Sequence, residues 1–197
     1  MSLVSSKLIN YLARREGLVL VPYRDGAGYS VGAGRFLGKV YPHERKITVQ
    51  EALDNLHEDV AKRENVFEKI AVPLEQHQLD ALLSLYYQGG SDGFDAVVKI
   101  INTREPDNAA SCLASDVEAA REMLKWDTSA SGEHMRGLFS RRGREVAMFA
   151  AGEYGSDLAK IPLWDEVDPE TKKPRMKDMK WHDVDPGDFD RTKRKKR

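Results

Sequence analysis

The sequence has little that would cross-link the chain or hold it in a membrane. Its one cysteine, Cys112, cannot form a disulfide within the chain, and a single thiol cannot make a cysteine-based zinc cluster. The longest apolar runs, such as 18–21, are far shorter than the roughly 20 residues that a membrane-spanning helix needs. The first residues lack the basic start, apolar centre and cleavage site of a secretory signal. We therefore expect no integral membrane segment, no signal peptide and no metal or other cofactor.

An excess of one charge is also missing. The 197 residues include 31 Lys and Arg against 32 Asp and Glu, so no strong attraction to nucleic acid is expected. Residues 155–197, however, hold 12 basic and 10 acidic side chains and four of the eight prolines. Such a segment is too charged and too broken to build its own core. We predict a globular body over 1–154 and a charged C-terminal extension over 155–197, with 161–181 lying against the body to bury its tryptophans and 191–197 mobile.

Apolar residues at three- and four-residue spacing predict that most of the body is helical. The first helix should end at Gly17, and a capping box at Thr48–Glu51 opens a helix expected to run to about Ile70. Between these two helices, six glycines separate short apolar pieces, as in a small antiparallel sheet. The pieces are 18–23, 29–31 and 36–41, and the later helices are expected at 75–87, 94–103, 108–125 and 135–151. The predicted class is α+β, mainly helical with a small N-terminal β lobe.

Three short motifs resemble catalytic or cofactor signatures without their context. Residues 89–93 match a nucleophile elbow, but helical spacing before them indicates a turn between two helices. His43 and His57 are each followed by Glu, yet neither has the second His that a zinc protease motif requires. Residues 32–34 begin like a dinucleotide fingerprint but lack its third glycine. We expect no hydrolase elbow, zinc site or nucleotide site from these motifs.

Two carboxylates flank the first predicted strand. Glu16 stands directly before Gly17, and Asp25 lies in a glycine-rich turn. We expect Glu16 to lie near packed apolar groups, where desolvation favours the acid, and Asp25 to be open to water and ionised. That division suits glycoside hydrolysis, in which an acid protonates the leaving oxygen and a base activates water or attacks, while Ser30 can hydrogen-bond a water. On spacing alone, carboxylates with no catalytic role are the simpler explanation.

The order of the motifs favours the catalytic interpretation. Over residues 3–152 the sequence resembles the phage-type lysozymes, the endolysins of glycoside hydrolase family twenty-four. The motifs that carry the resemblance are Glu16-Gly17, Tyr23-Arg24-Asp25, Gly28 to Gly34, Ala81 to Gly90, and Gly137 to Arg142 with Glu145 and Gly152. The resemblance implies a lysozyme-like fold and a muramidase that inverts the anomeric carbon while cutting the β-1,4 bond between N-acetylmuramic acid and N-acetylglucosamine in bacterial peptidoglycan.

The resemblance also implies a role for individual residues. Glu16 would be the general acid and Asp25 the base or electrostatic partner, while Ser30 stands where the family usually has a water-positioning threonine. Tyr23 and Gly34 would support the site, and Arg141 would pair with the catalytic glutamate, with Arg142 as the near alternative. Arg35 stands where a histidine is usual and Gln88 where an asparagine is usual.

The resemblance also suggests where the protein acts and what it binds. We expect a monomer that acts on peptidoglycan, held in the host cytoplasm before release to the periplasm or cell wall, or carried in the virion. The alternative is a non-catalytic cell-wall-binding or virion structural module on the same fold, against which the retained Glu16 and Asp25 argue. A nucleic-acid binder using 193–197 is disfavoured because nearly half of the charged residues in the extension are acidic and it lacks interleaved basic and aromatic residues.

Overall fold

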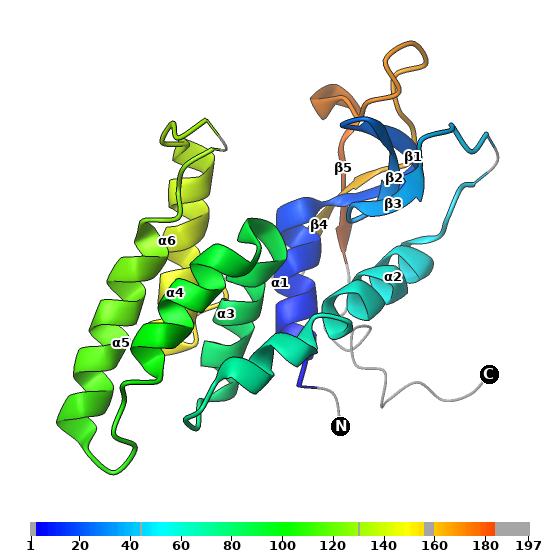
Figure 1. The fold of residues 1–197 in the computed structure, drawn as a ribbon. Coiled ribbons are helices and arrows are strands. Elements are labelled where there is room, and N and C mark those ends of the chain that lie inside the picture. The colour runs from blue at the N-terminus through cyan, green and yellow to red at the C-terminus, as the bar shows by residue number, and fades with distance from the viewer. Residues whose placement is uncertain (1–2, 44, 130, 156–159, 184–197) are drawn as a thin grey trace, which may run out of the picture. The chain divides into compact units, whose positions relative to one another are not determined.

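The computed structural model describes residues 3–43, 45–129, 131–155 and 160–183. The chain forms two compact units, coloured by residue number in Figure 1. We call Met1–Ser5 with Lys62–Gly155 the helical unit, and Ser6–Ala61 with Ser156–Arg197 the sheet unit. The sheet unit therefore combines segments from both ends of the sequence.

The sheet unit is built on five strands in the order β3-β2-β1-β4-β5. β1 (Leu18–Asp25) pairs antiparallel with β2 (Gly28–Gly32), which pairs with β3 (Arg35–Gly38). On its other edge β1 pairs in parallel with β4 (Lys160–Trp164), and β4 pairs antiparallel with β5 (Lys180–Asp183). β1 is thus the central strand, with hydrogen-bonded neighbours on both sides (Figure 1).

Two helices complete the core of the sheet unit. α1 (Ser6–Glu16) and α2 (Val49–Ala61) contact one another, and α2 also contacts β1, β2 and β3. Both present aliphatic side chains at helical spacing, which places one apolar stripe on each helix. The fully or almost fully buried side chains include Leu8, Ile9, Leu12, Leu18, Val31, Leu53, Leu56 and Ile161.

The predicted capping box at the start of α2 is confirmed, but the helix is shorter than predicted. The Thr48 backbone N–H donates to Glu51 Oε2 at 2.7 Å, and the Glu51 N–H donates to Thr48 Oγ1 at 3.1 Å. α2 ends at Ala61, and the next apolar pair, Val66 and Phe67, is buried by a separate 3₁₀ helix, η1 (Glu64–Lys69), in the helical unit. The expectation of one helix to Ile70 was therefore wrong.

The helical unit packs four α-helices. They are α3 (Gln76–Gly89), α4 (Ser91–Ile101), α5 (Ala109–Leu124) and α6 (Arg136–Ala151). Asn108 caps α5 by accepting from the Ala110 and Ser111 backbone N–H groups. Gly90, with a φ of 77°, is the one residue between α3 and α4, so the predicted helix-to-helix turn is confirmed, although residues 91–93 already belong to α4. The core side chains include Leu82, Leu83, Leu85, Phe94, Ile101, Met123, Met148 and Phe149.

One buried carboxylate gathers hydrogen bonds from three segments of the helical unit. Asp80 on α3 accepts from the hydroxyls of Ser5 and Tyr154, and from Gln76 Nε2 at 2.9 Å. Burial raises the pKa of Asp80, while these hydrogen bonds act in the opposite direction. Ser5 and Tyr154 lie beside the positions at which the chain passes into the sheet unit, so Asp80 anchors both of these segments within the helical unit.

The C-terminal extension supplies two strands that the sequence did not predict. Ile161 is fully buried in β4, which confirms that this part of the extension docks. The same prediction was wrong for Trp181, which is 54% exposed on β5. Residues 191–197, predicted to be mobile, lie outside the described residues. The α+β class is confirmed, and none of the helices described is long and apolar enough to cross a membrane.

Candidate active site

Glu16 is the last residue of α1, and the chain turns sharply after it. Gly17 has a φ of 71°, a conformation that favours glycine, and its N–H donates to the Ala13 carbonyl at 2.8 Å. A Cβ at Gly17 would lie 2.7 Å from the Trp164 ring, so the position also lacks room for a side chain. Glu16 itself is exposed. The expectation that packed apolar groups surround it was wrong, since it lies exposed at the end of α1.

Asp25 and Ser30 face each other across the β1–β2 hairpin. Asp25 pairs with Gly28 at the end of β1, and Ser30 pairs with Tyr23 two residues further in. Ser30 Oγ donates to Asp25 Oδ2 at 3.0 Å. Asp25 is exposed, as expected, whereas Ser30 is fully buried. The buried hydroxyl therefore fixes one oxygen of a carboxylate whose other side faces solvent.

The hairpin geometry depends on small residues. Gly26 has a φ of 56° in the turn that joins β1 to β2. At Gly28 a Cβ would collide with the Phe36 ring and lie 2.6 Å from the Gly38 carbonyl oxygen, so only glycine fits without displacing β3. Gly34 has a φ of 99° in the next turn and is exposed, while Tyr23 is half-buried. Both therefore lie in the same two hairpins as Asp25 and Ser30.

Arg35 anchors β3 to α2. Its Nε donates to Asp59 Oδ2 at 2.9 Å and its Nη2 to Asp59 Oδ1 at 2.8 Å, a bidentate pair. The guanidinium also donates to Asn55 and to Glu58. Hydrogen bonding to Asp59 raises the pKa of Arg35 above its ordinary value. Arg35 thus stabilises the hairpins from the α2 side.

Arg141 belongs to α6 of the helical unit, where it lies in a buried polar cluster. Its Nε donates to Glu145 Oε1 at 3.2 Å, and Arg142 Nε lies 3.1 Å from Glu145 Oε2. Ser84 Oγ donates to Glu145 Oε1 at 2.6 Å, and Arg142 Nη2 donates to Gln88 at 2.7 Å. Burial raises the pKa of Glu145, and the two guanidiniums act against this. No individual role was predicted for Glu145, although its three- and four-residue spacing from two arginines is a signal that the sequence displays.

Among the described residues, no group of three or more His, Cys, Asp and Glu is arranged to hold a metal ion. His134 Nδ1 lies 2.8 Å from Asp127 Oδ1, so these two side chains pair within the segment that joins α5 to α6.

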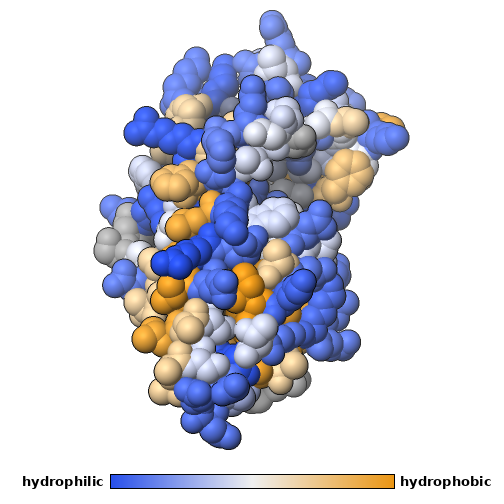
Figure 2. Space-filling model, turned by 60° about the vertical axis from the view of Figure 1, so that its left-hand side comes forward, coloured by the Kyte–Doolittle hydropathy of each residue, from blue (hydrophilic) through white to orange (hydrophobic). Residues whose placement is uncertain are grey.

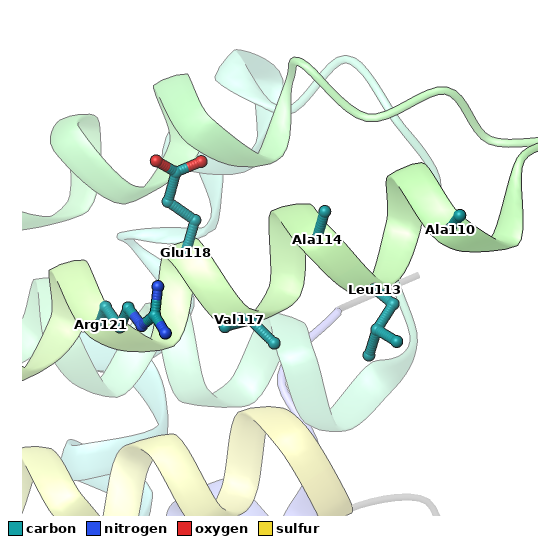
Figure 3. A pocket seen from close by; sticks show the side chains of 6 residues that line it. All are labelled: Ala110, Leu113, Ala114, Val117, Glu118 and Arg121. Atoms are coloured by element: carbon teal, nitrogen blue, oxygen red, sulfur yellow. The ribbon is translucent and has the colours of Figure 1, made fainter.

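A shallow hollow lies along α5 of the helical unit. Figure 3 shows Leu113 and Val117 projecting from one side of the helix and Glu118 from another, and the remaining lining residues are Ala110, Ala114 and Arg121. Leu113 is 66% exposed and Val117 43% exposed. Figure 2, in which this side of the helical unit comes forward, shows hydrophobic side chains gathered in the lower half of the view. With one carboxylate among its six residues, the hollow lacks the acid and base that glycoside hydrolysis requires.

Comparison with known proteins decides the family. Residues 13–145 match the phage lysozyme family, a range that contains Glu16, Asp25, Ser30 and Arg141. The chain belongs to the phage lysozyme family. The solved endolysin from Escherichia coli O157:H7 phage FAHEc1 has a TM-score of 0.64 and 30% identity, over 79% of this chain and 98% of that one. A mutant of P22 lysozyme has a TM-score of 0.62 and 28% identity, over 77% of this chain and 100% of that one.

Curated relatives are also endolysins. The endolysin of Salmonella phage P22 is 31% identical over 74% of this chain and 97% of its own length. The endolysin of Bacillus phage PZA is 31% identical over 76% of this chain, but the match spans only 55% of that relative. This membership of the phage lysozyme family indicates an enzyme that lyses bacterial peptidoglycan. The family match ends at Glu145, so β4 and β5 lie beyond it.

Proposed function

We propose that the protein is a muramidase that hydrolyses the β-1,4 bond between N-acetylmuramic acid and N-acetylglucosamine. The observation that carries the proposal is the hydrogen bond from buried Ser30 to exposed Asp25, in the hairpin that follows Glu16 in a phage lysozyme chain. Two solvent-accessible carboxylates at the two ends of β1 supply an acid and a base. That pair is the minimum that glycoside hydrolysis needs.

Each carboxylate has a distinct task in the proposed reaction. The Glu16 carboxyl gives its proton to the glycosidic oxygen, which leaves with the N-acetylglucosamine. Asp25 accepts a proton from a water whose oxygen bonds to the anomeric carbon of N-acetylmuramic acid from the opposite face. Since Ser30 is fully buried, we assign it to orienting the Asp25 carboxylate rather than to contact with bulk water. Solvent then returns the proton from Asp25 to Glu16.

The products of digestion test the bond specificity. Purified peptidoglycan is digested with the full-length protein, reduced with borohydride and analysed by mass spectrometry. A muramidase leaves reduced N-acetylmuramic acid at the new ends. Reduced N-acetylglucosamine ends, anhydro sugars, or peptides freed from intact glycan would each overturn the proposal, because each requires cleavage of another bond or another acceptor than water.

A further inference from the structure

The segment Lys160–Asp183 lies beyond the family match but contacts the candidate catalytic strand directly. β4 pairs in parallel with β1, with Leu18 opposite Leu163 and Val19 opposite Trp164 (Figure 1). β1 is the strand that joins Gly17, next to Glu16, to Asp25. Residues outside the family match therefore occupy the edge of β1 that β2 leaves open.

At the start of β1, Trp164 packs on the turn after Glu16. Its six-membered ring fills the space that a side chain at Gly17 would occupy, with Cζ3 only 2.7 Å from the position of a Cβ. The indole N–H donates to the Arg175 carbonyl at 3.0 Å, which fixes the ring from the other side. A positive φ at Gly17 is thereby held by a large aromatic ring that belongs to the extension.

At the other end of β1, Lys172 holds the residue before Asp25. The Arg24 backbone N–H donates to the Lys172 carbonyl at 2.7 Å. Lys172 has a φ of 56°, and among the described residues it is the one non-glycine residue in the left-handed region. Such a conformation is uncommon for a residue with a side chain and persists where the surroundings fix it.

Hydrogen bonds within residues 168–172 stabilise the loop that contains Lys172. Asp168 Oδ1 accepts from the Thr171 N–H at 2.8 Å and the Glu170 N–H at 3.0 Å, and the Lys172 N–H donates to the Asp168 carbonyl at 2.9 Å. The Lys172 ammonium lies 5.2 Å from the centroid of the Tyr41 ring, within cation–π range. These contacts aim the Lys172 carbonyl at β1.

We propose that the extension is a working part of the active-site lobe, in which Trp164 and Lys172 are positioning residues that fix the two ends of β1 and hence the placement of Glu16 and Asp25. This inference rests on the muramidase function proposed above. The physical reason is that a displacement of about 1 Å at a catalytic group can lower a rate by roughly a hundredfold. Each positioning residue contacts the immediate neighbour of one carboxylate.

The first test compares variants of Trp164 in the full-length chain. Trp164→Leu removes the aromatic ring from Gly17, whereas Trp164→Phe keeps one smaller aromatic ring and loses the fused second ring with its indole N–H. We expect Trp164→Leu to lower kcat about tenfold or more with little change in KM, and Trp164→Phe to recover most of that loss. Trp181→Leu, at the exposed tryptophan of β5, is the control and should match the wild type. All assays run well below the lowest melting temperature measured for the set.

The second test separates the backbone of Lys172 from its charge. Lys172→Gly and Lys172→Val both remove the ammonium, but glycine adopts a positive φ readily and a β-branched residue does not. We expect Lys172→Val to lower kcat about tenfold and to speed hydrogen exchange at the Arg24 amide, while Lys172→Gly keeps the amide protected and most of the rate. Equal effects of the two substitutions would show that the backbone geometry is irrelevant and would overturn the role of Lys172.

A readout that needs no turnover separates this proposal from the muramidase proposal. Carbon-13 NMR follows the titration of the Glu16 and Asp25 carboxyl groups in the wild type, Trp164→Leu and Trp181→Leu. We expect altered titration in Trp164→Leu only. If the wild type leaves no N-acetylmuramic acid ends but Trp164→Leu alters the titration, positioning stands and the muramidase proposal fails. A folded Trp164→Leu protein with wild-type kcat and wild-type titration refutes the positioning role.

Discussion

The Ser30 hydroxyl donates to the Asp25 carboxylate at 3.0 Å from a position with no exposed surface. Such a bond restricts the rotation of an otherwise exposed side chain. We predict that Ser30→Ala lowers lytic activity about tenfold and unfolding free energy by only about 1 kcal/mol, the usual contribution of one hydrogen bond. Turbidity clearance and urea unfolding measure the two quantities. Ser91→Ala, which removes an exposed serine–aspartate contact, should leave the activity unchanged.

Glu16→Gln should abolish nearly all activity and leave the fold intact. The amide keeps the shape of the side chain but has no proton to donate, and general acid catalysis contributes roughly 10²–10⁴-fold. Because Glu16 is exposed, the melting temperature of the Glu16→Gln protein should stay close to that of the wild type. Glu68→Gln, at another exposed glutamate, is the control. A Glu16→Gln protein that clears cell walls at the wild-type rate would exclude Glu16 as the acid.

The first-formed product should be the α-anomer. A water that enters opposite the leaving sugar inverts the β-linked carbon, and this route leaves space for water between the two carboxyl groups. Proton NMR of a soluble glycan digest in the first minutes, before mutarotation, distinguishes the anomers. An initial β-anomer would mean retention, with Asp25 or another group in a nucleophilic role.

The buried carboxylate of Asp80 predicts a pH dependence of stability. Burial raises its pKa above the unfolded value, so the folded state binds more protons between the two values and wild-type stability falls as pH rises through that interval. Asp80→Asn lacks this titration. The melting temperature of Asp80→Asn minus that of the wild type should therefore increase as pH rises from 4 upward and then level off. A difference that decreases with pH would show that the hydrogen bonds from Ser5, Tyr154 and Gln76 outweigh burial.

Glu145→Leu should be strongly destabilising because it leaves two buried guanidiniums without their shared carboxylate. Removing one partner of a buried ion pair typically costs about 3–5 kcal/mol. The double variant Arg142→Met/Glu145→Leu should lose less than the sum of its two single substitutions, since it removes both charges together. Urea unfolding of the four proteins completes the cycle. Strict additivity would show that Arg142 and Glu145 are energetically independent.

Local signals predicted most of the fold. The Thr48–Glu51 capping box, the glycine after Glu16 and the turn at Gly90 each lie where the structure has them. Their physical causes act over a few residues, through free backbone donors and positive φ angles, so the sequence displays them directly. The hydrogen bond between Asp25 and Ser30 joins residues that are close in the hairpin and was within reach of the same reasoning.

The rest depends on contacts between residues far apart in the chain. β4 buries Ile161 and Leu163 in alternation, but the alternation covers only five residues and contains Pro162, which lacks a backbone donor and is unusual between two neighbouring strands. Glu16 was expected near apolar groups because helix ends often pack, and the direction of the turn at Gly17 could not be seen from spacing. The hydrogen bond from the Arg24 backbone N–H to the Lys172 carbonyl could not be predicted either, because these two residues are far apart in the sequence.

The pairing of β4 with β1 also has a consequence for the order of events during synthesis. Leu18 emerges from the ribosome long before Leu163, and residues 62–155 of the helical unit lie between them in the chain. The first three strands must wait with one edge of β1 open until β4 has been synthesised. On this basis the sheet unit is complete only after β4 has been synthesised, so a nascent chain that stops before β4 holds Glu16 and Asp25 in an incomplete sheet.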